Sequence, residues 1–105
     1  MFFMNGARID DESMVPEGWF EKATATTEAA RSSGALAEFP QAGYGFMWWT
    51  TDGPAYEALG IFAQTIRINP ELDLVIATQS AWPAALSGIH LEPPFMKALE
   101  TAVQE

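Results

Sequence analysis

The sequence contains no cysteine, one histidine and five basic residues among its 105. Without cysteine the chain has no disulfide, no thiolate metal site and no cysteine nucleophile. The single histidine, His90, has no second imidazole with which to form a zinc site or a catalytic pair, so we expect it on the surface. The run Asp10-Asp11-Glu12 is the best candidate for a cation site, but consecutive side chains in a turn rarely converge on one ion. We therefore predict no metal and no cofactor.

Positive charge is also scarce, since 14 acidic residues against five basic ones give a net charge of −9. Nucleic acids and anionic membranes select clustered lysine and arginine. We therefore predict neither as a partner. No apolar run approaches the roughly 20 residues that cross a bilayer, and the first residues lack the pattern of a signal peptide. The sequence therefore does not identify the cellular compartment. The basic residues are scattered along the chain as Arg8, Lys22, Arg31, Arg67 and Lys97.

The first half of the chain shows little regular patterning. Residues 1–4 are typical of the last turn of a helix, with Asn5-Gly6 as its stop signal, which suggests that sequence upstream is missing. Pro16 is expected to open a short helix. Residues 24–43 are rich in small and polar side chains and predict a long surface loop, with one helical turn near 28–31.

The second half predicts a sheet followed by a helix. Strands are expected at 44–50, about 56–69 and 73–79, separated by turns at 51–54 and 69–73. The run Leu74–Thr78 is nearly all apolar, as in a strand buried on both faces. The fold class is therefore α+β, with a three-stranded antiparallel meander, short N-terminal helices and one domain over 1–105. A helix near 93–104 should pack on one face of the sheet through the apolar stripe of Phe95, Met96, Leu99 and Val103.

Several stretches together resemble a known family. They are Phe3-Met4-Asn5-Gly6-Ala7-Arg8-Ile9-Asp10, Val15-Pro16-Glu17-Gly18-Trp19, Tyr44-Gly45-Phe46-Met47-Trp48-Trp49, and the run Ala58–Ile76 that contains Ile68-Asn69-Pro70-Glu71-Leu72-Asp73. Their order and spacing resemble the C-terminal segment of the serine-β-lactamase-like hydrolase superfamily, on the branch of the 6-aminohexanoate-dimer hydrolases and esterases. The resemblance implies a fragment of the β-lactamase-like fold and, in a complete enzyme, hydrolysis of an amide, lactam or ester.

The family's catalytic motif is absent from this chain. The resemblance implies an S-x-x-K motif, in which a lysine helps to activate a nucleophilic serine. None of the five serines has lysine three positions later, so no catalytic residue is predicted within the chain. Where the family has a third motif of K-T-G or H-x-G type, this chain has Ala58-Leu59-Gly60, and only Gly60 matches. The backbone N–H of the next residue, Ile61, stands where the family donates to an oxyanion.

Two readings of Trp48-Trp49 stay open. The rings could form a pocket wall and stack on a substrate, but adjacent tryptophans on a strand more often pack one on each face.

Two hypotheses for the whole chain also stay open. It is either the C-terminal part of a serine hydrolase, inactive without an N-terminal part, or a non-catalytic self-associating module derived from that fold. Exposed strand edges and apolar faces predict either a homodimer or a missing N-terminal part as the partner.

Overall fold

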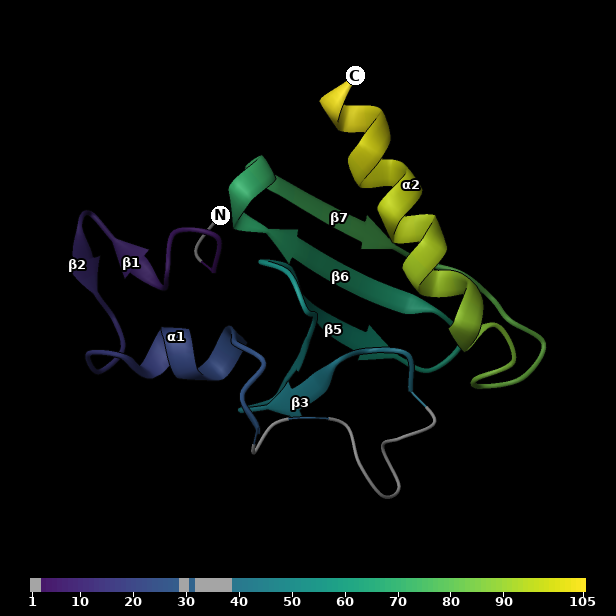
Figure 1. Cartoon of the computed structure of the whole chain (residues 1–105), viewed down its shortest axis with the longest axis horizontal. Helices are drawn as coiled ribbons and strands as arrows, with labels where there is room; N and C mark the ends of the chain where they lie inside the picture. Colours follow the sequence, from purple (N-terminus) through teal and green to yellow (C-terminus); the bar gives the residue numbers. More distant parts are fainter. Residues whose placement is uncertain (1–2, 29–30, 32–38) are drawn as a thin grey trace.

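The computed structural model of the chain describes residues 3–28, 31 and 39–105 (Figure 1). The fold is α+β, with a C-terminal helix and a five-stranded antiparallel sheet. A separate two-stranded hairpin, β1 (Arg8–Ile9) and β2 (Glu12–Ser13), precedes helix α1 (Trp19–Thr24). The helix end predicted at 1–4, the helical turn at 28–31 and the loop at 24–43 each fall partly outside the described residues.

The central sheet has five strands where the sequence predicted three. Its spatial order is β3-β4-β5-β6-β7, and each strand pairs with its neighbour in the chain. The strand predicted at 44–50 is a hairpin, and so is the strand predicted at 56–69. The bounds are β3 (Gly43–Gly45), β4 (Trp48–Thr50), β5 (Tyr56–Gly60), β6 (Gln64–Asn69) and β7 (Leu74–Thr78), with the 3-10 turn η3 (Pro70–Leu72) before β7.

Both missed hairpins turn at residues that are unusual in turns. Phe46 and Met47 have φ of 45° and 72°, and Phe62 and Ala63 have φ of 62° and 70°. Positive φ is adopted mainly by glycine, asparagine and aspartate, so these turns carry none of the usual sequence signals. The second turn is held by the Phe62 N–H, which donates to the Ala85 carbonyl at 2.9 Å.

Helix α1 begins at Trp19, three residues later than Pro16, where the sequence predicted it. Gly18 immediately before it has φ of 72°, a left-handed conformation that suits glycine and redirects the chain into the helix. Ala23 is fully buried, and the Phe20 ring meets the Tyr56 ring edge to face at 5.8 Å. The short helix thus covers one end of the sheet (Figure 1).

The sheet has two chemically different faces. Consecutive strand residues point to opposite faces, so Tyr56 and its neighbour Glu57 on β5 separate them. The Tyr56 face carries an aromatic cluster in which Trp48 lies between Phe3 at 5.2 Å and Tyr56 at 5.0 Å. The Tyr56 hydroxyl donates to the Phe3 carbonyl at 2.7 Å. The Glu57 face is covered by helix α2 (Glu92–Gln104), which follows the 3-10 turn η4 (Ile89–Leu91).

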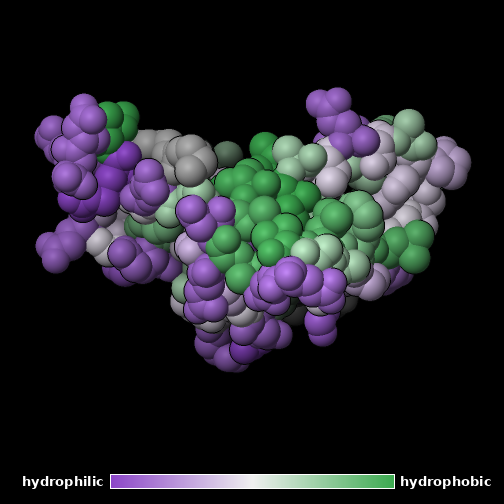
Figure 2. Space-filling model, turned by 90° about the horizontal axis from the view of Figure 1, so that it is seen from above, coloured by the Kyte–Doolittle hydropathy of each residue, from purple (hydrophilic) through white to green (hydrophobic). Residues whose placement is uncertain are grey.

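Strand β7 is not buried on both faces, which corrects the prediction from its apolar run. It lies at the edge of the sheet, and Val75 is 41% exposed. On β6 the predicted alternation is confirmed, with Ile66 and Ile68 on one face and Arg67 on the other. Ile66 is 46% exposed because α1 and the aromatic cluster cover only the far end of that face. Seen from the β7 side, hydrophobic surface extends across the middle of the molecule (Figure 2).

Helix α2 forms where predicted, but its buried residues differ from the predicted stripe. Met96 is buried as expected, whereas Phe95 and Val103 are exposed and Leu99 is half-buried. Glu92 is buried instead, and it lies one turn before Met96 on the same side of the helix. The reason is that the sheet face under α2 carries Glu57, Arg67 and Asn69, so the helix presents carboxylates to it.

Candidate functional site

The strand expected to line a pocket ends at the residue singled out in the sequence. Gly60 is the last residue of β5 and pairs with Gln64 on β6. A β-carbon at Gly60 would lie 3.1 Å from Cβ of Gln64, which is tighter than an ordinary contact, so a larger residue would require Gln64 to shift. Residues of both strands, Gly60 among them, line a shallow hollow of about 370 Å³. Ile61 follows in the turn and is 60% exposed, outside the strand itself.

The two adjacent tryptophans pack on opposite faces of the sheet, which confirms the packing interpretation. Trp48 joins the aromatic cluster on the Tyr56 face. On the other face Trp49 stacks on Phe39 at 4.6 Å and contacts Tyr44 at 4.8 Å. Both indoles are half-buried. A role as a pocket wall stays a prediction.

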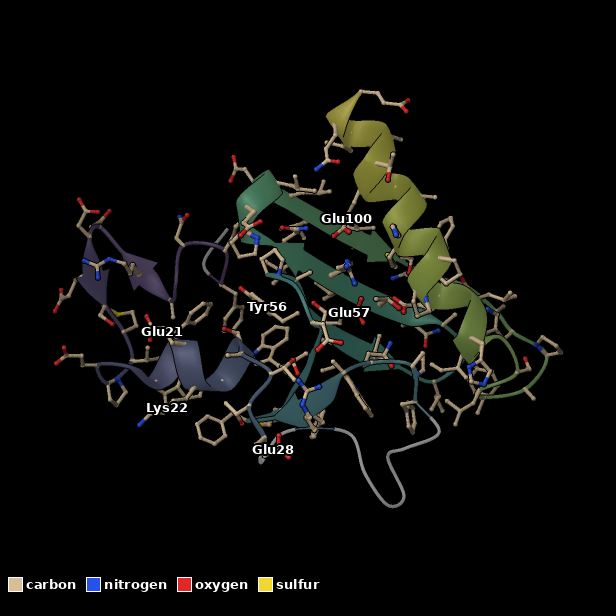
Figure 3. All side chains as sticks on the ribbon, in the orientation of Figure 1. Glu21, Lys22, Glu28, Tyr56, Glu57 and Glu100 are labelled. Atoms are coloured by element: carbon tan, nitrogen blue, oxygen red, sulfur yellow. The ribbon has the colours of Figure 1, made fainter. Side chains whose placement is uncertain are left out.

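The sequence did not predict the most polar buried region, which lies between the sheet and α2. Arg67 on β6 is the centre of an ion-pair network, with one N–H donated to Glu57 and another, from Nε, donated to Glu100 at 2.8 Å. Asn69 Nδ2 donates to the same Glu100 oxygen at 2.9 Å. Figure 3 shows that Glu57 comes from the sheet and Glu100 from α2. The network therefore joins three elements through charged hydrogen bonds.

A second carboxylate pair lies at the start of α2. The side-chain amide of Gln41 donates to Glu57 Oε2 and to Glu92 Oε2, both at 3.2 Å. Gln41, Glu57 and Glu92 are all buried. Two carboxyl groups thus share one amide in an interior where a single arginine is already engaged by Glu57 and Glu100.

The electrostatics of these groups differ from one end of the network to the other. Burial, together with repulsion from Glu57, raises the pKa of Glu92 to about 7. For Glu100, burial opposes ionisation, but hydrogen bonds from Arg67 and Asn69 prevail and lower its pKa. The pKa of Arg67 is raised because its bonds to Glu100 and Glu57 outweigh the effect of burial. Glu92 therefore exchanges its proton near neutrality while Glu100 stays ionised.

These groups line a cavity of about 540 Å³ between α2, the sheet and the turn before β5. Helical spacing could have indicated that this side of α2 faces the cavity, because Glu92, Met96 and Glu100 are four residues apart and share one side of the helix. The sequence favoured the apolar stripe instead, because Leu99 and Val103 fit a helical period equally well.

Two further expectations concern metal binding and membrane-spanning helices, and the described part of the chain can be compared with both. Within residues 3–28, 31 and 39–105, no group of three or more acidic or histidine side chains is arranged to hold a metal ion. Asp10 and Asp11 form the exposed turn of the β1–β2 hairpin, with φ of 48° and 65°. No helix in this part of the chain is long and apolar enough to cross a membrane.

Comparison with known proteins relates the chain to a hydrolase. No known family profile matches it. The chain is 32% identical over 84 residues to the 6-aminohexanoate-dimer hydrolase of Paenarthrobacter ureafaciens. The match covers 76% of this chain and 21% of that hydrolase, so the chain spans about a fifth of the length of its relative. The chain is thus similar to one portion of a 6-aminohexanoate-dimer hydrolase.

Proposed function

We propose that this chain forms the C-terminal sheet portion of a serine-β-lactamase-like hydrolase domain. The observation that carries the proposal is its 32% identity to about a fifth of a 6-aminohexanoate-dimer hydrolase. The antiparallel sheet with a C-terminal helix against one face agrees with that assignment. In the complete enzyme the reaction would be hydrolysis of an amide, lactam or ester.

On this proposal the 105 residues do not catalyse the reaction alone. A serine hydroxyl is a weak nucleophile until a nearby base removes its proton. No serine here has lysine three positions later, so nucleophile and base would come from polypeptide outside these residues. We expect no turnover of a chromogenic ester or of a β-lactam reporter above a blank without protein. Turnover that is lost on replacing one of the five serines with alanine would contradict the proposal.

The contribution of this chain to the active site would be a backbone donor. Acyl transfer needs N–H groups directed at the oxygen that becomes negatively charged in the transition state. The Ile61 N–H follows Gly60 in an exposed turn, where polypeptide outside these residues could bring a substrate carbonyl against it. Trp48 and Trp49 would stiffen the neighbouring hairpin and border the pocket.

A chimera tests the role of Ile61. In it, this chain replaces the matching segment of the 6-aminohexanoate-dimer hydrolase, and hydrolysis of the 6-aminohexanoate dimer is measured. Ile61→Pro removes the N–H and should lower kcat about 100-fold or more, whereas Ile61→Ala keeps the N–H and most of the activity. Equal loss in both variants, with both folded by circular dichroism, would rule out a backbone role.

The exposed side of β7 favours a second candidate, a self-associating module. Ile66 and Val75 are each more than two-fifths exposed beside an unpaired strand edge, and such a surface is usually covered by a partner. The partner would be a second copy of the chain or the missing N-terminal part of the hydrolase.

Sedimentation velocity at micromolar concentration separates these two partners. A homodimer that Val75→Lys dissociates, while Ile9→Lys on the distant hairpin does not, would favour the module. A monomer in the unsubstituted chain would leave the N-terminal part as the partner.

A further inference from the structure

Two buried oxygen atoms in the cavity under α2 have no hydrogen-bond donor among the residues that the structure describes. They are Oε1 of Glu92 and Oδ1 of Asn69. Glu92 is 6% exposed and Asn69 is 7% exposed, and both line the cavity of about 540 Å³. Buried polar atoms are nearly always paired in folded proteins. Asn69 Oδ1 is an acceptor, and so is Glu92 Oε1 when its carboxyl is ionised, so in that state the cavity is short of donors.

The charges around the cavity are predominantly negative. Arg67 is engaged by Glu57 and Glu100, and Lys97 is exposed. At the Glu92 end, the carboxyl groups of Glu57 and Glu92 share the side-chain amide of Gln41. An anion would be repelled there. The charged residues that face the cavity are Asp52, Glu57, Glu92 and Glu100 against Arg67 and Lys97.

We propose that this cavity binds an organic primary ammonium ion, with the ammonium group at Glu92 beside Glu57 and a second donor of the ligand at Asn69. An ammonium group has three N–H donors and one positive charge, which supplies what Glu92 Oε1 lacks. A metal ion fits less well, because no group of three suitable ligands exists in the described part of the chain.

The spacing of Glu92 and Glu100 along α2 guides the choice of ligand length. Asn69 is bonded to Glu100, which lies eight residues after Glu92 on α2. Eight residues of α-helix rise about 12 Å. An aliphatic chain of about six carbons, with an ammonium group at one end and a hydroxyl or amide at the other, spans most of that backbone separation and offers one donor to each acceptor. The second donor is neutral, because Arg67 and Lys97 would repel a second cation.

Ligand binding should depend on the proton of Glu92. An ammonium group binds the ionised carboxylate, and the pKa of Glu92 is about 7 because of burial and the nearby Glu57. The carboxyl groups of Asp52, Glu57 and Glu100 face the same cavity, together with Arg67 and Lys97. Affinity should therefore rise between about pH 6 and pH 8.

Titration with 6-aminohexan-1-ol, followed by amide chemical shifts, tests this proposal. Saturable shifts are expected in the first turn of α2 and at the end of β6, with tighter binding at pH 8 than at pH 6. Glu92→Gln should weaken binding about 10- to 100-fold, while Glu21→Gln on α1, which removes the same charge elsewhere, should not change it. Figure 3 shows Glu21 on α1, away from Glu57 and Glu100.

Three results would overturn the proposal. They are equal binding of hexan-1-ol to the unsubstituted chain, unchanged affinity in Glu92→Gln, and no saturable shift at about 20 mM ligand, a concentration that exceeds any useful affinity. The hexan-1-ol comparison needs no variant, so it remains decisive whatever Glu92→Gln does to folding.

Discussion

Replacing Glu92 with glutamine should make the protein more stable at alkaline pH. The Glu92 carboxyl is buried beside Glu57, and its pKa in the folded chain is about 7 against an ordinary value of 4.5. The folded chain therefore holds this proton more tightly than the unfolded chain does. The resulting stability is fully present below about pH 4.5 and is lost as the pH rises through about 7.

The size of the effect follows from the pKa. Each tenfold change in acid dissociation corresponds to about 1.4 kcal/mol, so a pKa of about 7 in place of 4.5 makes the ionised Glu92 unfavourable by about 3 kcal/mol above pH 8. Glutamine has the same shape, carries no charge, and can accept the hydrogen bond from Gln41. The variant should match the parent chain at pH 4.5 and exceed its free energy of unfolding by up to about 3 kcal/mol at pH 8.5.

Urea unfolding of both proteins at pH 4.5, 6.5 and 8.5 measures this difference. The other titrating groups are common to both proteins, so they cancel when the two free energies are subtracted. Glu21→Gln, at an exposed position of α1, serves as the matched control and should show no such rise with pH. A Glu92→Gln variant that is no more stable than the parent at pH 8.5 would refute the buried, partly protonated state of Glu92.

Three further substitutions test other parts of the structure. Met47→Gly should raise the free energy of unfolding by about 1 kcal/mol in chemical denaturation, because Met47 is 83% exposed at a φ of 72°; a loss would mean that its side chain packs. Arg67→Met should lower that free energy by about 3–5 kcal/mol, since it leaves Glu57 buried without a cation; a change under 1 kcal/mol would contradict the network. Tyr56→Phe should lower the free energy of unfolding by about 1 kcal/mol at neutral pH, because it removes the hydrogen bond from the Tyr56 hydroxyl to the Phe3 carbonyl. Burial raises the pKa of Tyr56 to about 12, so the parent chain should lose stability above pH 10 as the unfolded tyrosine ionises, and Tyr56→Phe should lose less.

The sequence predicted the fold class and the helix at the end of the chain because these depend on strong local signals. Pro93-Pro94 occupy the first turn of α2, where proline is favoured, and β-branched residues alternate along β6. The strand number was wrong because Phe46-Met47 and Phe62-Ala63 adopt left-handed turns that tertiary contacts hold in place. Such contacts, like the bond from Phe62 to Ala85, join residues far apart in sequence and leave no local pattern.

The buried network was missed for a similar reason. Glutamate and arginine are usually on the surface, so a single sequence favours the solvated interpretation of Glu57, Arg67 and Glu92. Only their convergence from β5, β6 and α2 shows that they are buried together. Gly60 ends β5 and Ile61 lies in the turn that follows, whereas the sequence predicted one continuous strand through both, and their role in catalysis is still a prediction.

The central claim, that this chain is the sheet portion of a serine hydrolase, is tested most directly by the activity of the unsubstituted chimera. In that protein the relative supplies its own nucleophile and base, and this chain replaces only the matching fifth of its length. We predict a folded chimera that hydrolyses the parental enzyme's substrate, with kcat/KM within about 100-fold of the parent, a loss of about 3 kcal/mol in transition-state stabilisation. A chimera that is fully folded by circular dichroism and thermal unfolding, yet shows no turnover above that of its nucleophile-to-alanine variant, would contradict the claim.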